Sequence, residues 1–169
     1  LIKARRHKID DEIYFRNLKD NNIYLYRLNN IDKKKALLDL ISSEEKVVLN
    51  QKSLHLAWCV VDPKTIEKYI TSLNEMGVDK ITFIYSDYSQ KNFKVNIEKL
   101  EKILINSSCQ CGRSNIIKLD VCKNIETFIK ENPDTYFLDF SNVSINEKCD
   151  EIKTLVIGCE GGFSQKERE

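Results

Sequence analysis

Hydrophobic and polar positions divide the chain into two parts with different periodicities. Short alternating runs in the first fifty residues predict strands at Asp11–Arg16, Asn22–Asn29 and Ala36–Ser42. A polar segment from Asn17 to Asn22 suits a hairpin turn between the first two of these strands. We therefore expect a small β domain over residues 1–50.

From Ser53 onward the pattern changes to strands that alternate with helices. An apolar run over 54–61 predicts a strand, and it is followed by Asp62 as a helix cap and Pro63 at the first helical position. Gly77 is a typical stop for that helix. Its expected apolar face carries residues at three- and four-residue spacing, namely Ile66, Tyr69, Ile70, Leu73 and Met76.

The remaining pattern continues the alternation to the end of the chain. Further strands are predicted at 80–85, 116–119, 135–140 and 154–157, and further helices at 96–109 and 124–131. Such alternation is typical of a mostly parallel sheet covered by helices. We therefore expect an α/β domain over residues 51–169, with one domain boundary near residue 50.

Charge alone does not indicate a nucleic-acid partner. There are 27 Lys and Arg against 26 Asp and Glu, a net charge of +1, although the positive excess lies in the first third. Its basic residues can neutralise phosphates, or they can be solvated charges beside the acidic run Asp10–Glu12. The basic residues in question are Arg5, Arg6, Lys8 and Arg16.

Several protein classes are excluded by the rest of the composition. No apolar run approaches the ~20 residues that a membrane span needs, and no secretory leader opens the chain. The 6 cysteines contain no Cys-x-x-Cys pair and have no cluster of histidines beside them, so we expect reduced thiols, a cytoplasmic location and no metal site.

The segment most suggestive of chemistry is a glycine loop directly after the last predicted strand. It contains Gly158, Gly161 and Gly162, and glycines there let backbone approach a ligand closely. Their spacing matches neither the Gly-x-Gly-x-x-Gly fingerprint nor a phosphate-binding P-loop. From the residues alone, a structural turn and a ligand-binding loop both remain open.

Two other features have weaker functional interpretations. Arg113, in a segment between a helix and a strand, can hold a phosphate or stabilise an oxyanion, or it can be an ordinary surface residue. His55 lies within an apolar strand, where we expect a core or surface role rather than catalysis. No Ser/His/Asp order and no Gly-x-Ser-x-Gly elbow supports a hydrolase.

Several motifs together carry a family resemblance. Residues 157–164 (Ile-Gly-Cys-Glu-Gly-Gly-Phe-Ser) are similar to an Ile-Gly-Pro-Glu-Gly-Gly-Phe-Ser signature, and Gln110–Arg113 is similar to a Gln-x-x-Arg segment. Glu75–Val78 resembles Glu-Leu-Gly-Val, and Arg6 falls where a Val-Leu-Arg motif ends. In these features the chain resembles the bacterial 16S ribosomal RNA (uracil-N3)-methyltransferases of the SPOUT superfamily.

The chain also departs from that family. Cys159 replaces the usual proline, Ser72 stands where a lysine is usual, and Ser86–Tyr88 replaces a segment with an arginine. The closing Leu-Arg-x-Glu-Thr segment, with the helix that threads the knot, has no counterpart before Glu169. We therefore expect a methyltransferase domain that lacks its C-terminal end, and a β domain that lacks its beginning.

The resemblance implies a fold, a cofactor and partners. The fold is a SPOUT-type parallel sheet with a C-terminal trefoil knot, incomplete in this chain, after a partial PUA-like β-barrel over 1–50. The implied protein is a homodimer that uses S-adenosylmethionine and binds ribosomal RNA through Arg5, Arg6, Lys8 and Arg16.

The resemblance also implies roles for individual residues. Arg113 is expected to stabilise negative charge on the uracil or to bind its phosphate, and Glu160 to orient the loop or the cofactor. The expected cofactor-binding residues are Leu138, Asp139, Ile157, Gly158, Glu160, Gly161 and Gly162. Two rival hypotheses are a non-catalytic RNA-binding protein with a SPOUT-like dimerisation scaffold, and a nucleotide-binding enzyme that acts on small molecules.

Overall fold

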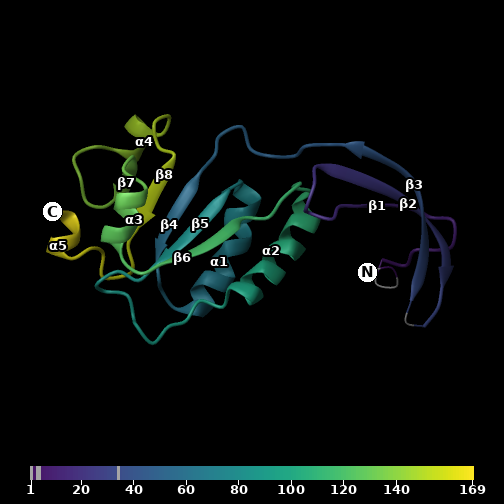
Figure 1. Ribbon diagram of the computed structural model, residues 1–169, viewed down its shortest axis with the longest axis horizontal. Coiled ribbons are helices and arrows are strands. Elements are labelled where there is room, and N and C mark those ends of the chain that lie inside the picture. Colours follow the sequence, from purple (N-terminus) through teal and green to yellow (C-terminus); the bar gives the residue numbers. More distant parts are fainter. Residues whose placement is uncertain (1, 3–4, 34) are drawn as a thin grey trace. The chain divides into compact units, whose positions relative to one another are not determined.

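The computed structural model describes residues 2, 5–33 and 35–169, and it forms two compact units (Figure 1). One unit is Leu1–Leu49 with Gly112–Asn115, and the other is Asn50–Cys111 with Ile116–Glu169. The short segment joins the first unit through hydrogen bonds. Val48 N donates to Ser114 Oγ at 2.6 Å, and Ser114 N donates to Val48 O at 3.1 Å.

The first unit is built on an antiparallel sheet in the order β1-β2-β3. The hairpin turn between β1 and β2 is held by Asn17 Oδ1, which accepts hydrogen bonds from the backbone amides of Lys19 and Asp20. The predicted strands and hairpin are confirmed, although the third strand runs three residues beyond its predicted end. Their bounds are β1 Glu12–Phe15, β2 Asn22–Ile31 and β3 Ala36–Glu45.

The second unit contains a parallel sheet in the order β6-β5-β4-β8-β7, which confirms the predicted α/β fold. Figure 1 shows its strands fanned beside the helices. The strands are β4 His55–Cys59, β5 Lys80–Ile84, β6 Lys118–Cys122, β7 Thr135–Leu138 and β8 Thr154–Ile157. The helices are α1 Pro63–Met76, α2 Ile97–Cys111, α3 Ile125–Glu131, α4 Ile145–Lys148 and α5 Gln165–Arg168.

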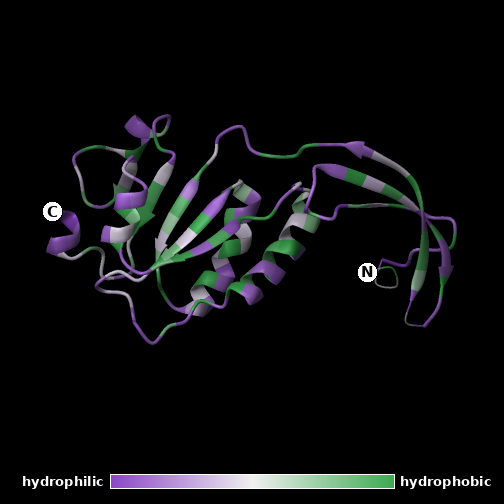
Figure 2. Cartoon of the chain, viewed as in Figure 1, coloured by the Kyte–Doolittle hydropathy of each residue, from purple (hydrophilic) through white to green (hydrophobic). Residues whose placement is uncertain are grey.

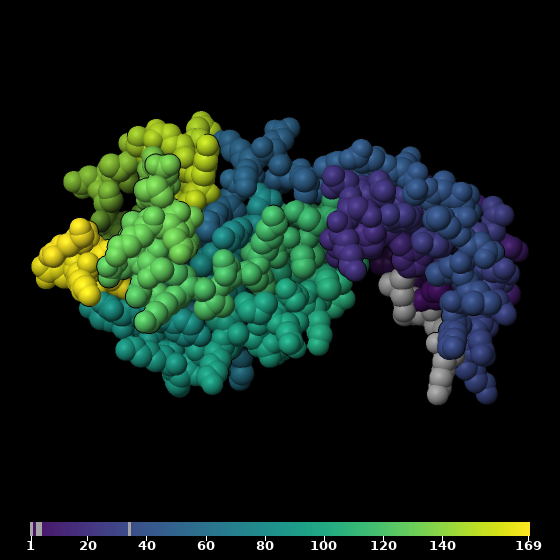
Figure 3. All heavy atoms as spheres, in the orientation of Figure 1, coloured from purple at the N-terminus to yellow at the C-terminus, as the bar shows by residue number. Residues whose placement is uncertain are grey.

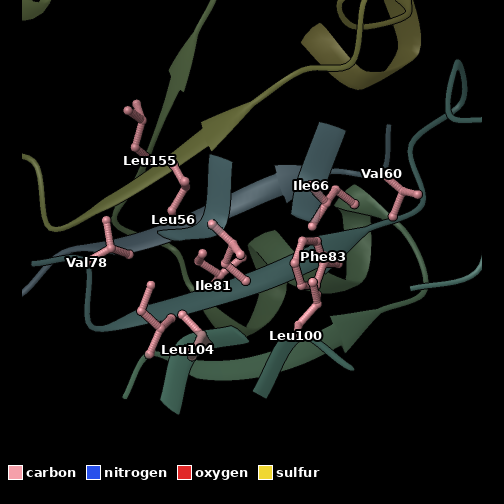
Figure 4. Close-up of a cluster of buried hydrophobic side chains, with 11 residues drawn as sticks. Leu56, Val60, Ile66, Val78, Ile81, Phe83, Leu100, Leu104 and Leu155 are labelled. Atoms are coloured by element: carbon pink, nitrogen blue, oxygen red, sulfur yellow. The ribbon is translucent and has the colours of Figure 1, made fainter. Parts of the chain in front are cut away.

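The core of this unit follows from the alternation of side chains along the strands. Leu56 faces the layer formed by α1 and α2, whereas the next residue, Ala57, faces the layer that contains α3. Figure 4 shows the hydrophobic cluster on the side of Leu56, in which side chains of α1 and α2 meet the sheet. Figure 2 shows apolar and polar positions alternating along both long helices. The labelled cluster includes Leu56, Ile66, Ile81, Phe83, Leu100, Leu104 and Leu155.

Some local expectations were wrong. Tyr69 and Met76 are 48% and 67% exposed, because only the part of the apolar stripe around Ile66 and Ile70 meets the sheet. Asp62 takes the N-cap position of α1, yet its carboxylate makes no capping hydrogen bond. The predicted strand 116–119 is displaced to Lys118–Cys122.

Two short helices, α4 and α5, were not predicted. Each begins with a capping box, in which the serine side chain accepts a hydrogen bond from a nearby backbone amide, and the carboxylate of a glutamate three residues later accepts one from the serine's own amide. The pairs are Ser144 with Glu147 and Ser164 with Glu167. The Ser-x-x-Glu spacing at the start of each helix is a sequence pattern that indicates a helix start.

The order of the strands marks where a ligand binds in such a sheet. The chain passes from β4 through β5 to the edge strand β6, whereas β8 and β7 lie on the other side of β4. In open parallel sheets ligands collect beyond the carboxyl ends of the strands, at the point where the strand order reverses. That point lies between β4 and β8. Within the described part of the chain, no helix is long and apolar enough to cross a membrane.

Candidate active site

A cavity of about 430 Å³ lies at the carboxyl ends of β7 and β8. Leu138 pairs with Ile157 at the ends of these neighbouring strands, so the segments that follow lie close together. All seven residues expected to bind the cofactor line this one cavity. The lining comprises Leu138, Asp139, Phe140, Ile157, Gly158, Cys159, Glu160, Gly161, Gly162, Phe163 and Arg168.

The glycine loop is both a tight turn and a wall of the cavity. Gly162 N donates to Cys159 O at 2.8 Å, and Gly162 has a φ of 70°, in the left-handed region. A Cβ on Gly158 would lie 3.2 Å from the Cα of Gly162 and 3.3 Å from Cζ of Phe163. A side chain at 158 would therefore press on the backbone of Gly162 and the ring of Phe163, which would have to shift by a few tenths of an ångström. Glu160 and Gly161, at the tip of the loop, are exposed.

An ion pair fixes the rim of the cavity. The guanidinium of Arg168, at the end of α5, donates from Nε to Asp139 Oδ2 at 2.6 Å and from Nη2 to Asp139 Oδ1 at 3.2 Å. This pairing lowers the pKa of Asp139, so the carboxylate is ionised at neutral pH. In Figure 3 the C-terminal residues, in yellow, pack beside the green and yellow-green residues of the same unit.

The loop after β5 is tied to the start of α5. Ser164 Oγ donates to Asp87 Oδ2 at 2.6 Å, and Asp87 N donates to Glu167 Oε1 at 2.9 Å. The segments that follow β5, β7 and β8 are therefore linked by hydrogen bonds, through Asp87 and through the pair of Arg168 with Asp139. This linkage lets one cavity have a defined shape even though its walls come from separate loops.

Nucleophilic chemistry by a thiol is not supported at this site. Burial raises the pKa of the Cys59 thiol to about 12, so it stays protonated at neutral pH. The Cys159 sulfur accepts a weak hydrogen bond from Ser86 Oγ at 3.9 Å, and its thiol donates to Gly162 O at 3.8 Å. Among the residues that the structure describes, no group of three His, Cys, Asp or Glu side chains could hold a metal ion.

The family of this chain follows from a comparison with models of protein families. The model described as an RNA methyltransferase domain matches residues 49–169, which include the whole cavity. This chain belongs to the RNA methyltransferase family. The ribosomal RNA small subunit methyltransferase E of Helicobacter pylori is 42% identical over 171 residues, which cover 99% of this chain and 76% of the relative.

Two solved methyltransferase structures share the fold. A methyltransferase of Legionella pneumophila, solved with the cofactor SAM, has a TM-score of 0.83 at 22% identity and covers 99% of this chain and 73% of its own. The ribosomal RNA small subunit methyltransferase E of Neisseria gonorrhoeae, bound to S-adenosyl methionine, has a TM-score of 0.80 at 16% identity, with the same coverage of both chains. The α/β fold with its parallel sheet is therefore the fold of known methyltransferases.

The predicted residue Arg113 lies in the first unit, and it is not among the residues that line the cavity. It is 6% exposed, and its Nε and Nη2 donate to Asn115 Oδ1 at 3.2 and 3.1 Å. These bonds hold the guanidinium within the segment Gly112–Asn115. A catalytic role for Arg113 in this methyltransferase stays a prediction.

The residues expected to bind RNA also lie in the first unit. Arg5, Arg6 and Lys8 are exposed, which leaves their charges open to a phosphate. Arg16 is partly buried and donates from Nη1 to Asn21 O at 3.4 Å. Their RNA-binding role stays a prediction.

His55 lies at the amino end of β4, whereas the cavity lies at the carboxyl ends of the neighbouring strands. Its Nε2 is 2.8 Å from Thr82 Oγ1, and burial together with the nearby Lys80 charge lowers its pKa to about 4. His55 is therefore neutral at pH 7. This placement fits the structural role expected for it from the sequence.

Some residues at the cavity were missed from the sequence. Phe140 is fully exposed at the rim, and Arg168 reaches the cavity only because α5 folds back onto the end of β7. The capping box that starts α5 was the one available signal for Arg168. Nothing in the local pattern distinguished Phe140 as a lining residue. Phe163 belongs to the signature over residues 157–164, but it was not among the residues expected to bind the cofactor.

Proposed function

We propose that this protein transfers a methyl group from S-adenosylmethionine to N3 of a uridine in 16S ribosomal RNA of the small ribosomal subunit. The observation that carries the proposal is the cavity at the ends of β7 and β8, which gathers every residue that the family resemblance assigns to the cofactor. The names of the relatives support the small-subunit ribosomal RNA as substrate. The choice of uridine N3 rests on the family resemblance.

The cavity suits this cofactor chemically. Its volume of about 430 Å³ lies within the usual range for small-molecule sites. Leu138, Ile157 and Phe163 give it apolar walls for a purine ring, while Asp139 and Glu160 add carboxylates to the lining. Glycines in the remaining wall bring backbone polar groups close to a ligand. The residues present therefore fit the group.

Each part of the lining has a role in holding the cofactor. Asp139, kept ionised by Arg168, accepts hydrogen bonds from hydroxyl or ammonium groups. The exposed carboxylate of Glu160 favours a positive charge near the glycine loop. When bound, S-adenosylmethionine supplies an electrophilic methyl group on a sulfonium.

The chain's own contribution to the rate is positioning and electrostatics. The fixed loops hold the reacting groups at the distance needed for in-line attack, which replaces a bimolecular encounter by a local one. N3 lies on the Watson–Crick edge, so the target base has to be unpaired or swung out before it can reach the cavity. We keep Arg113 as the group proposed to stabilise negative charge on the uracil or to bind its phosphate.

The first unit is proposed to bind the RNA. Arg5, Arg6 and Lys8 are exposed, and phosphate contacts of this kind weaken as salt rises. From the family resemblance we further infer a partial PUA-like barrel over residues 1–50, a methyltransferase domain over 51–169 with an incomplete trefoil knot, and a homodimer. A ribosomal substrate implies that the enzyme works in the cytoplasm.

Calorimetric titration with S-adenosylmethionine tests the cofactor assignment. Asp139→Asn removes the charge that Arg168 pairs with at the rim, and we expect about tenfold weaker binding. Asp134→Asn is the matched control, because the exposed Asp134 precedes the same strand at its opposite end. Equal affinity of the two variants would overturn the role of Asp139, and no binding by the unmodified protein would overturn the proposed function.

A further inference from the structure

A second hollow, of about 200 Å³, adjoins the glycine loop. It shares Cys159, Glu160 and Gly161 with the cofactor cavity. Its other walls come from residues 60–62, directly after β4, and from the loop between β5 and α2. It therefore lies at the same carboxyl edge of the sheet and has the wall at 159–161 in common with the larger cavity.

The loop after β5 is held firmly although part of it is exposed. Tyr85 Oη donates to Phe93 O at 3.0 Å, and Ser86 N donates to the hydroxyl of Ser89 at 3.2 Å. Ser86 and Ser89 are buried, yet Tyr88 between them is 55% exposed. The backbone on both sides of Tyr88 is thus fixed, which leaves an aromatic side chain presented to solvent at the hollow.

Tyr88 packs tightly against the glycine loop. A Cβ on Gly161 would lie 3.2 Å from Cβ of Tyr88 and 3.3 Å from its Cδ2. Glycine at 161 therefore allows the tyrosine to approach the wall that both cavities share. An aromatic ring so placed offers a flat surface beside the proposed methyl donor.

The polar side chains of the hollow are exposed and are not bonded to the rest of the described fold. In the described part of the protein, the side chains of Asp62, Gln90 and Glu160 form no hydrogen bond. Asp62 occupies a capping position, where an aspartate usually bonds to the helix amides, but its carboxylate does not do so. The hollow thus combines two aromatic residues, Tyr88 and Phe93, with unused donors and acceptors.

We propose that this hollow binds the target uracil, an inference that rests on the proposed function. The base stacks on Tyr88, a contact that tolerates any flat ring. The edge of uracil presents an N–H between two carbonyl oxygens. The Asp62 carboxylate accepts the N3–H hydrogen bond, and the Gln90 amide N–H donates to a neighbouring carbonyl.

Asp62 then acts as the general base. Its carboxylate takes the N3 proton, and the N3 electron pair forms the new bond to the methyl carbon, whose former bonding pair stays with the sulfur. Glu160, in the shared wall, keeps its role beside the positive sulfur.

Asp62→Asn tests the base directly. Asparagine caps a helix as well as aspartate does, so α1 keeps its N-terminal residue while the proton acceptor is lost. We expect kcat for methylation of small ribosomal subunits to fall about a hundredfold or more, with the calorimetric affinity for S-adenosylmethionine unchanged. A kcat within about threefold of the unmodified enzyme, or an equal loss of cofactor affinity, would overturn the assignment.

Tyr88→Leu tests the stacking, and Tyr69→Leu is its matched control. Tyr69 is 48% exposed on α1 and does not line the hollow. We expect Tyr88→Leu to raise KM for the ribosomal substrate about tenfold and Tyr69→Leu to leave it unchanged. Equal KM values would overturn the base-binding role. Failure of the proposed function itself would look different, because the unmodified protein would not bind S-adenosylmethionine.

Discussion

Gly162→Ala places a side chain at a position whose φ of 70° favours glycine. A non-glycine residue in this left-handed region costs about 1–2 kcal/mol. The added Cβ would meet nothing closer than Arg168 Nη2 at 3.8 Å, so backbone strain is the main perturbation. Gly112→Ala is the matched control, because Gly112 has a φ of 79°, has no atom within 4 Å of an added Cβ and does not line the cavity.

The backbone strain at position 162 affects either cofactor binding or stability, and a different measurement reports each effect. If the loop relaxes, the conformation that shapes the cavity becomes less populated by a factor of about 5–30, and the apparent Kd for S-adenosylmethionine rises by the same factor. If packing holds the loop, the strain remains and the free energy of unfolding falls by about 1–2 kcal/mol. We expect the first outcome, because Glu160 and Gly161 are exposed and one backbone bond, from Gly162 to Cys159, closes the turn.

Calorimetric titration and chemical denaturation of both variants provide the assay. Gly162→Ala is expected to bind S-adenosylmethionine about 5–30-fold more weakly, whereas Gly112→Ala should bind it normally and lose only stability. The reasoning is refuted if Gly162→Ala changes neither the Kd nor the free energy of unfolding. It is equally refuted if Gly112→Ala weakens binding as much as Gly162→Ala does.

Three further predictions concern pH, capping and RNA. His55 has an ordinary pKa of 6.5 and a folded pKa of about 4, so unfolded chains bind a proton that folded ones do not between these values. Stability should fall by about 1–2 kcal/mol as pH drops from 6.5 to 4, after allowance for the half-buried ring, and His55→Gln should flatten that slope in denaturation curves. Ser164→Ala should lower the free energy of unfolding by about 1 kcal/mol, because α5 loses its cap; no change in a urea titration would contradict this. Replacing Arg5 and Arg6 together by alanine should weaken RNA binding and reduce its salt slope, and an unchanged slope in filter-binding assays would disprove the phosphate contacts.

The layered fold was predictable because its signals are local. The apolar run before Asp62, the proline at 63 and the glycine at 77 identify a strand, a helix start and a helix end, and all three lie between residues 54 and 77. Gly77 does adopt the left-handed conformation, with a φ of 94°. A parallel sheet then follows from the alternation of strands and helices, without knowledge of any distant contact.

The contacts that shape the site could not be predicted, because they join segments far apart in sequence. Arg168 reaches Asp139 across 29 positions, and Ser164 reaches Asp87 across 77. Whether a polar side chain is satisfied locally is equally invisible to sequence patterns, as Asp62 shows by leaving its cap unbonded. The glycine loop was open to two interpretations, and the structure shows that it is a tight turn and a cavity wall at once.

The most direct test of the account is methyl transfer itself. Purified protein is incubated with S-adenosylmethionine and small ribosomal subunits that lack the modification, and the nucleosides of the digested RNA are analysed by mass spectrometry. The account predicts 3-methyluridine, formed in proportion to active enzyme and about 5–30-fold more slowly by Gly162→Ala when S-adenosylmethionine is kept well below both Kd values. Methylation of a different nucleoside, or none despite measured binding of S-adenosylmethionine, would contradict it.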